Sequence, residues 1–215
     1  MFPLWNSLRI SLISTAISFC LGILLAQWIM KAPKALKGAA DTIITMPMAL
    51  PPTVIGYFLL VSISPKSFLG GFLKEWFGVV VTMRWEASVL AVIIVTLPLM
   101  YRTARGAFEA FDKNLTDAGR TLGLPNSYIF FHIVLPSCRQ GVIAGAVLAF
   151  ARGIGEYGAT SMVSGYIAGK TATVSTSVAY YWQIGQDGSA MKWVLVNLGL
   201  SFVIMGLMNF FEKKR

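Results

Sequence analysis

Long stretches without a charged residue constrain this sequence more than any other feature. Residues 10–30 contain 21 consecutive residues with no Asp, Glu, Lys or Arg, and about 20 apolar residues in a helix suffice to cross a bilayer. The whole chain is 56% hydrophobic and 13% charged, with a mean hydropathy of +0.68. These values exclude an ordinary soluble domain. The sequence predicts a polytopic membrane protein whose 215 residues form one bundle.

The first two predicted spans are residues 10–30 and residues 42–65. A cleaved signal peptide is the alternative for the first, but it would need a basic start and a shorter apolar core, and residues 1–7 carry no side-chain charge. The second span contains Pro51 and Pro52. Proline breaks the helical ladder, and non-helical backbone within a membrane is tolerated where it is buried in protein or lines a wet cavity. We therefore predict that this span is part of a pore wall.

A third span follows an outer loop at residues 64–86, in which Trp76, Phe77 and Trp85 indicate a short interfacial helix. Residues 87–101 give only 15 uncharged positions, so we expect this helix to begin earlier, near residues 79–84, with charged side chains at the interface.

The fourth predicted span is residues 141–163, and the fifth is residues 193–211 after an outer loop at residues 165–192. Small residues recur every four positions in the fourth span, which lets helices approach closely. These residues are Gly141, Gly145, Ala149 and Gly153.

The net charge of +9 does not indicate a nucleic-acid partner, because the basic residues follow the positive-inside rule for membrane proteins. With residues 102–140 taken as a cytoplasmic loop, eleven basic residues lie inside and five outside. This assignment predicts an N-terminus outside the cell membrane and a cytoplasmic C-terminus. The inside set is Lys31, Lys34, Lys37, Arg102, Arg105, Lys113, Arg120, Arg139, Lys213, Lys214 and Arg215, and the outside set is Lys66, Lys74, Arg84, Lys170 and Lys192.

The sequence gives no support for catalysis or metal binding by this chain. Cys20 and Cys138 lie in positions that do not favour a disulfide, and no metal-ligand spacing exists. The single histidine, His132, has no acidic or cysteine cluster around it, which indicates a satisfied polar residue. Lys170 and Thr171 follow a glycine as in a phosphate-binding loop, but the spacing to Gly165 is one residue short. We therefore expect ATP to be hydrolysed on another chain.

The cytoplasmic loop carries a short polar helix, predicted over residues 115–122. Asn114 is a favoured N-cap residue, Asp117 places a carboxylate near the positive helix end, and Gly123 is the residue type expected just past a helix stop. One helix face presents two leucines and two small residues, and it could dock into a groove on another protein. These four residues are Leu115, Ala118, Gly119 and Leu122.

The spacing across residues 113–136 resembles the EAA loop of ABC importer permeases. That pattern is Glu-Ala-Ala, three residues, Gly, nine residues, Ile, one residue and Leu-Pro. Gly123 and Pro136 match it, as do the Ile and Leu positions between them, whereas Asp117 and Gly119 replace the Glu and the second Ala. The resemblance implies a coupling helix seated in a separate cytoplasmic ATPase subunit. The alternative is a linker helix that packs on its own bundle.

Two further segments resemble the molybdate-type branch of these permeases. Residues 150–160 (FARGIGEYGAT) are similar to Phe-Ala-Arg, two residues and Gly-Glu-Phe-Gly-Ala-Thr, and residues 48–57 (MALPPTVIGY) are similar to a Leu-Pro-Pro segment. The resemblance implies the permease subunit of a molybdate importer in a bacterial or archaeal inner membrane, surrounded by lipid. Its implied partners are a second copy of the chain, two ATP-binding subunits and an external oxyanion-binding protein.

Arg152 and Glu156 are the candidate charged residues within the membrane. They lie four residues apart on one predicted helix face, and charges inside a membrane usually face a bundle interior or an aqueous path. A structural pair and a direct role in the anion path both remain open. Pro51, Pro52, Thr53 and Tyr57 complete the candidate path, and Thr45 offers a further hydroxyl.

The sequence as a whole predicts an all-α permease of five transmembrane helices with a cytoplasmic coupling helix, in one domain over residues 1–215. The resemblance implies that the permease binds no cofactor itself and imports molybdate through a dimer interface. Sulfate, thiosulfate and tungstate remain alternative substrates. A self-contained secondary transporter and a membrane assembly factor without transport are the other classes, and ATP dependence or absence of flux would separate them.

Overall fold

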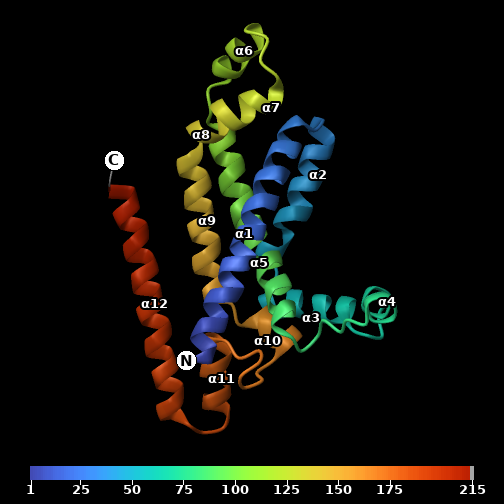
Figure 1. Ribbon diagram of the computed structural model, residues 1–215, viewed down its shortest axis with the longest axis vertical. Helices are drawn as coiled ribbons and strands as arrows, with labels where there is room; N and C mark the ends of the chain where they lie inside the picture. The colour runs from blue at the N-terminus through green and yellow to red at the C-terminus, as the bar shows by residue number, and fades with distance from the viewer. Residues whose placement is uncertain (214–215) are drawn as a thin grey trace.

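The computed structural model describes residues 1–213, and every regular element in that range is helical. Four long helices run lengthwise: α1 (Phe2–Lys31), α5 (Trp85–Glu109), α9 (Arg139–Ile154) and α12 (Asp187–Lys213). The short helices α6 (Lys113–Thr121) and α7 (Asn126–Ile129) project from one end of this bundle, and α10 (Gly158–Ser164) and α11 (Val174–Gln183) lie at the other (Figure 1).

Three helices in the described range are long and apolar enough to cross a membrane alone: α1, α5 and residues Asp187–Gly206 of α12. Two bent pairs also qualify if each pair counts as one span. The chain bends by 105° between Leu36–Met48 and Pro52–Ile63, and by 71° between Asn126–Ser137 and Arg139–Ile154. The geometry is thus compatible with the five predicted spans, although two of them are not straight helices.

Helix α1 turns a stripe of serines inward, beside buried isoleucines such as Ile10 and Ile29. Ser11, Ser14 and Ser18 are fully buried. The Ser14 hydroxyl donates to the Val89 carbonyl at 3.1 Å, and Ser18 shares a 3.0 Å hydrogen bond with Thr96. Small side chains that hydrogen-bond to α5 let the two helices lie close together, which is typical of helix packing in membranes.

The small residues of α9 serve the same purpose, as the sequence predicted. A Cβ atom on Gly141 would lie 2.6 Å from the Cβ atom of Ala107, and one on Gly153 would lie 3.0 Å from Val92. Both contacts are with α5. The main hydrophobic core therefore forms where α1, α5 and α9 meet, around residues such as Ile29, Met100 and Ala149.

The second predicted span is broken more sharply than the sequence suggested. The chain forms α2 (Lys34–Thr45), a 3-10 turn η1 (Met46–Met48) and α3 (Pro52–Ile63), which runs across the bundle (Figure 1). Pro51 and Pro52 stand at the break, because neither can donate a backbone hydrogen bond to continue the helix.

Three other predicted boundaries were wrong. The third helix starts at Trp85, not near residues 79–84, and gains its length by continuing to Glu109. The loop that follows it is therefore shorter than the one predicted at residues 102–140. The fourth span does not run unbroken to residue 163, because α9 ends at Ile154 and α10 follows. The predicted outer loop at residues 165–192 contains helix α11, which Thr173 caps by a capping box with Thr176, and it also contains the start of α12 at Asp187, before the predicted span 193–211. Helix α4 (Phe68–Phe77) fits the predicted interfacial helix, although Trp85 belongs to α5.

Candidate functional site

Helix α6 begins two residues earlier than the sequence predicted. The carboxylate of Asp112 accepts a hydrogen bond from the backbone N–H of Asn114 at 2.9 Å, so Asp112 is the N-cap and Asn114 lies inside the helix. An acidic N-cap satisfies an otherwise unpaired backbone donor and also favours the positive helix end. Asn114 and Asp112 are both good cap residues, and the choice between them depended on backbone geometry that the sequence did not contain.

The end of α6 is a Schellman motif built on Gly123. The N–H of Gly123 donates to the Arg120 carbonyl at 2.9 Å, and the N–H of Leu124 donates to the Gly119 carbonyl at 3.1 Å. Gly123 has a φ angle of +75°, which confirms the predicted helix stop. The motif fixes the direction in which the chain leaves α6 and enters α7.

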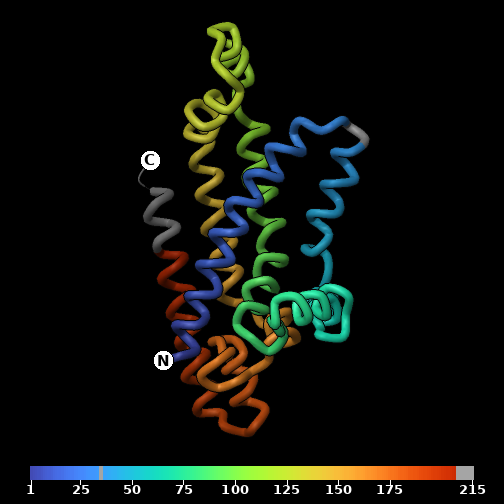
Figure 2. The backbone as a smooth tube through the Cα atoms, turned by 45° about the vertical axis from the view of Figure 1, so that its right-hand side comes forward, coloured from blue at the N-terminus to red at the C-terminus, as the bar shows by residue number. Residues whose placement is uncertain are grey.

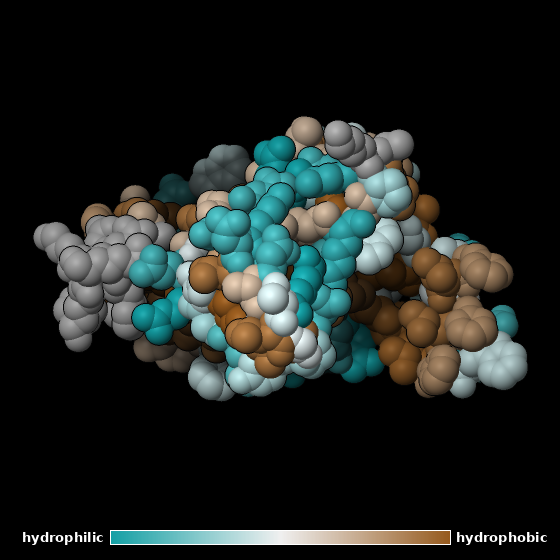
Figure 3. Space-filling model, turned by 90° about the horizontal axis from the view of Figure 1, so that it is seen from above, coloured by the Kyte–Doolittle hydropathy of each residue, from teal (hydrophilic) through white to brown (hydrophobic). Residues whose placement is uncertain are grey.

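Three of the four residues predicted on the docking face are exposed, and one is not. The side chain of Leu122 is 78% exposed, that of Leu115 is 48% exposed, and Ala118 is exposed as well. Gly119 instead packs against α7, where an added Cβ would lie 3.1 Å from Ile129. Viewed onto this end of the molecule, apolar residues appear among hydrophilic ones (Figure 3). Helix α6 therefore presents leucines outward while its glycine holds it against α7.

Asp117, at the position of the motif's first acidic residue, is exposed and pairs with Arg120 at 3.0 Å between Oδ1 and Nη1. Arg120 also donates from Nε to the side-chain oxygen of Asn126 at 3.3 Å. This surface pair keeps the Arg120 side chain across the α6–α7 turn, but its exposure means that it contributes little to stability.

The loop that carries α6 and α7 is anchored to the end of α5. Helix α7 continues into a π-helical turn, η2 (Phe130–Val134), and then into α8 (Leu135–Ser137). The ring of Phe130 meets Phe108 edge-on at a centroid distance of 5.8 Å, and the Cys138 thiol lies 3.3 Å from the Ala107 carbonyl oxygen. These contacts join the projecting loop to the bundle without fixing the outer face of α6.

At the break in the second span, α3 lies almost backbone to backbone against α10. A Cβ on Gly56 would lie 2.8 Å from the Cα atom of Ala159, and one on Gly158 would lie 2.9 Å from the Cβ of Pro52. Thr53 and Tyr57 are exposed on the same helix. The Thr45 hydroxyl donates to the Asp41 carbonyl within α2 at 2.8 Å, so it is already satisfied.

Arg152 and Glu156 form the predicted ion pair, with 2.6 Å between Nη1 and Oε2. The Glu156 side chain is 1% exposed, whereas that of Arg152 is 36% exposed. The other carboxylate oxygen of Glu156 accepts a hydrogen bond from the backbone N–H of Ala159 at 2.8 Å. Glu156 therefore joins the end of α9 to the first turn of α10, and Arg152 is the more accessible partner.

The break after α9 opens onto a groove of about 440 Å³ that the sequence analysis missed. Tyr157 lies on one side of it, and Asn197 and Ser201 of α12 lie on the other. Asn197 interrupts an otherwise apolar span, and this was the signal that could have indicated a polar lining. Arg152 and Glu156 do not line this groove, although they are adjacent to it in sequence.

The remaining candidates have structural explanations. His132 stacks on Tyr128 with ring centroids 4.1 Å apart, and its Nδ1 lies 3.2 Å from the Tyr128 carbonyl oxygen. No cluster of three metal-ligating side chains occurs among residues 1–213. Before α11, Tyr166 stacks on Tyr180 of that helix with ring centroids 4.0 Å apart, and burial raises the pKa of Tyr166 to about 12.

Residues 18–215 match the protein family described as binding-protein-dependent transport system inner membrane component. The chain is 36% identical over 206 residues to the molybdenum transport system permease protein ModB of Escherichia coli K12, covering 94% of this chain and 90% of that protein. It is 32% identical to the putative molybdenum transport system permease YvgM of Bacillus subtilis, covering 94% and 89%. It is also 29% identical to the sulfate transport system permease CysW of Synechocystis, covering 95% and 74%.

Solved structures share the fold at low sequence identity. An inward-facing methionine ABC transporter, MetNI, superposes with a TM-score of 0.75 at 16% identity, covering 99% of this chain and 94% of that one. A bacterial alginate ABC transporter in complex with a periplasmic protein gives a TM-score of 0.77 at 17% identity, covering 99% and 78%. Together with the matches above, these likenesses assign the chain to the binding-protein-dependent transport system inner membrane components, as a non-enzymatic permease subunit with the type I ABC importer fold.

Proposed function

We propose that this chain is the membrane-spanning subunit of an ATP-driven importer of molybdate. The observation that carries the substrate is the 36% identity to a molybdenum permease across 94% of the chain. The FARGIGEYGAT segment, which resembles the molybdate-type branch of these permeases, also supports this substrate, and its charged residues form the Arg152–Glu156 pair. The oxyanion would cross the inner membrane between two copies of the chain, with an external binding protein delivering it.

Energy for transport would come from two cytoplasmic ATP-binding subunits that contact α6. The outward-facing leucines support this proposal, because an exposed apolar face on a projecting helix suits insertion into a groove of a partner. Closure of the ATPase pair would move α6 as a rigid lever through its anchors on α5, and the spans would switch from inward to outward opening. ATP hydrolysis would then reset them.

The proposed orientation puts α6 and the C-terminus in the cytoplasm and the N-terminus outside. Helix α12 would face lipid or the second copy, since only 6% of its apolar window is buried within the chain. In the translocation path we assign Pro51, Pro52, Thr53 and Tyr57 to the wall at the broken span. Arg152 is the candidate contact for the anion, because its guanidinium is accessible and offers several hydrogen-bond donors to an oxyanion.

Sulfate is the second candidate substrate, and the 29% identity to a sulfate permease favours it as the alternative. Molybdate and sulfate are both tetrahedral dianions, so a path that passes one has no simple electrostatic reason to reject the other. Selectivity would then rest largely with the external binding protein.

Uptake of labelled molybdate and labelled sulfate at limiting concentrations, in cells that lack this chain, tests the proposal. We expect selective loss of molybdate uptake, restored by the wild-type chain. Leu122→Glu should fail to restore it because the charge would be buried in the ATPase groove, whereas Leu36→Glu changes an exposed leucine of α2 at the same end and should restore it. Loss of sulfate uptake alone would overturn the substrate, and loss of neither would overturn the oxyanion importer.

A further inference from the structure

Helix α2 is held to the bundle mainly by polar contacts. None of its described side chains is fully buried, and Ala40 and Ile44 only partly cover the core formed by α1 and α5. A helix that buries so little apolar surface gains little from the hydrophobic effect. Its position beside α5 must therefore depend on other contacts.

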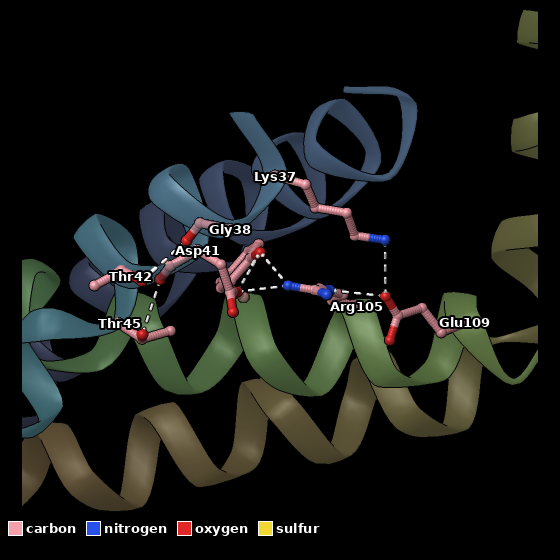
Figure 4. Close-up of polar contacts among 8 residues, drawn as sticks. Lys37, Gly38, Asp41, Thr42, Thr45, Arg105 and Glu109 are labelled. Atoms are coloured by element: carbon pink, nitrogen blue, oxygen red, sulfur yellow. Dashed lines mark hydrogen bonds and ion pairs between the residues drawn. The ribbon is translucent and has the colours of Figure 1, made fainter. Parts of the chain in front are cut away.

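Those contacts form a network of five side chains, Lys37 and Asp41 from α2 with Tyr101, Arg105 and Glu109 from α5 (the α2–α5 network). The guanidinium of Arg105 pairs with Asp41 through Nη1 and donates from Nε to Glu109 Oε1 at 2.9 Å. Lys37 approaches the same Glu109 oxygen at 3.3 Å, and Figure 4 shows these side chains pointing toward one another between the two helices. The Tyr101 hydroxyl donates to Asp41 Oδ1 at 2.8 Å.

The geometry of the network fixes one helix relative to the other. A planar guanidinium that bonds a carboxylate on each helix sets both their separation and their axial register. The Asp41 and Arg105 side chains are 31% and 20% exposed, so the pair is neither sealed in a dry core nor free in solvent. Such a pair can hold a register and still rearrange when the helices move.

The network lies between the two parts of the molecule that the proposed function requires to move together. Helix α5 ends at Glu109, and only residues 110–112 separate it from α6. Helix α2 leads through the 105° bend into α3, which touches α10 at Gly56. At the other end of α5, Ala91 and Val95 pack directly against Ile55 of α3. At the cytoplasmic end, Asp41 and Arg105 join α5 to α2, where the apolar contact between the two helices is slight.

We propose that Asp41 and Arg105 are positioning residues for transport, which couple movement of α5 and α6 to the broken span α2–α3. This inference rests on the proposed function. It assigns to the ion pair a role in movement, in addition to holding α2 beside α5.

The test uses the full complex, with its ATPase subunits and binding protein, in proteoliposomes. It compares wild type, Asp41→Asn, Arg105→Gln and the double variant. We expect each single variant to lower molybdate uptake per ATP hydrolysed by about fivefold, with ATPase activity in the absence of binding protein unchanged. The double variant should be no worse than the worse single one, because both remove the same connection. Arg105→Lys keeps the charge without the planar fork and should be intermediate.

The matched control is Arg84→Gln, which breaks the Arg84–Glu86 pair (2.7 Å) at the opposite end of α5 and should leave the ratio unchanged. Thermal melting of each variant shows whether folding has changed.

A normal ratio of molybdate uptake to ATP hydrolysed in either single variant, or effects that multiply in the double variant, would overturn the inference. If the wild-type complex moves no molybdate but binding protein stimulates its ATPase, the substrate proposal fails. The network is then tested by the ratio of ATPase activity with binding protein to that without it, which the single variants should lower. An ATPase that binding protein does not stimulate in wild type would overturn both.

Discussion

At the scale of single residues, glycine does more than any other residue type to shape the candidate site, and for two different reasons. Gly123 is needed for its backbone, since its φ is +75° and an added Cβ would meet nothing within 4 Å. Gly56 and Gly158 are needed for space, because the backbones of α3 and α10 lie too close together for a side chain at either position. Sequence alone predicted the first role from its position after a helix. It did not predict the second, which depends on two segments far apart in the chain.

Gly123→Val should weaken coupling without disturbing the bundle. A β-branched residue in the left-handed region costs about 1–2 kcal/mol, which would favour a different exit from α6 and displace its leucines. We expect lower uptake at an unchanged protein level, measured with labelled molybdate in cells that lack the native chain. Gly123→Asn is the matched control, since asparagine tolerates this conformation and should keep most of the uptake. Equal uptake by the valine and asparagine variants would contradict a role for the turn.

At the scale of elements, the sequence predicted that helices exist where apolar runs are long, and it failed where a helix is interrupted by packing. The α1 and α12 spans were found because each is continuous. The break after Ile154 was missed because residues 141–163 carry no proline, and the interruption comes from Glu156, which leaves the helix to accept the N–H of Ala159. The extension of α5 to Glu109 was missed for a related reason. Its charged last turns look like a loop, but they pair with α2.

Substitutions can separate the structural role of Glu156, which accepts the Ala159 N–H, from the proposed role of Arg152 in the anion path. Glu156→Gln keeps an oxygen for the Ala159 N–H and loses the charge, so we expect a near-normal protein level. Glu156→Ala leaves that buried donor unpaired at a cost of about 1–3 kcal/mol and should lower the protein level. The measurements are the amount of protein in the membrane and uptake per molecule.

Arg152→Ala completes this series. It leaves a buried carboxylate without its partner, and it removes the accessible cation from the proposed path. We expect lower uptake per molecule as well as less protein. Unchanged uptake at a normal protein level would contradict both the structural and the path role of Arg152.

At the scale of the whole molecule, a large apolar surface remains exposed along one side of the bundle. Helix α12 stands at the edge of the bundle with its apolar surface exposed, and α6 projects beyond it (Figures 1 and 2). The N-terminal end of α1 lies with α11 at the end opposite α6, where Asn6 donates to the carbonyl oxygens of Thr171 and Ala172. This arrangement suits a subunit that meets lipid or a second copy along its length and different partners at its two ends.

The proposed orientation predicts which end faces the cytoplasm. In a background with Cys20 and Cys138 replaced, Leu122→Cys should react with a membrane-impermeant maleimide only after the inner membrane is opened. Lys170→Cys should react in cells whose inner membrane is intact. Both positions are exposed, so access to the reagent depends on the side of the membrane. The reverse pattern would show that the positive-inside assignment is wrong for this chain.

The proposed function requires that molybdate cross through this subunit only when separate ATPase subunits drive transport. The most direct measurement is labelled molybdate entering proteoliposomes that contain the complete complex and external binding protein, with and without ATP at the cytoplasmic face. We expect accumulation of molybdate that requires ATP and is lost in Leu122→Glu, while Leu36→Glu behaves as wild type. Equal molybdate flux without ATP, or flux that Leu122→Glu leaves unchanged, would contradict it.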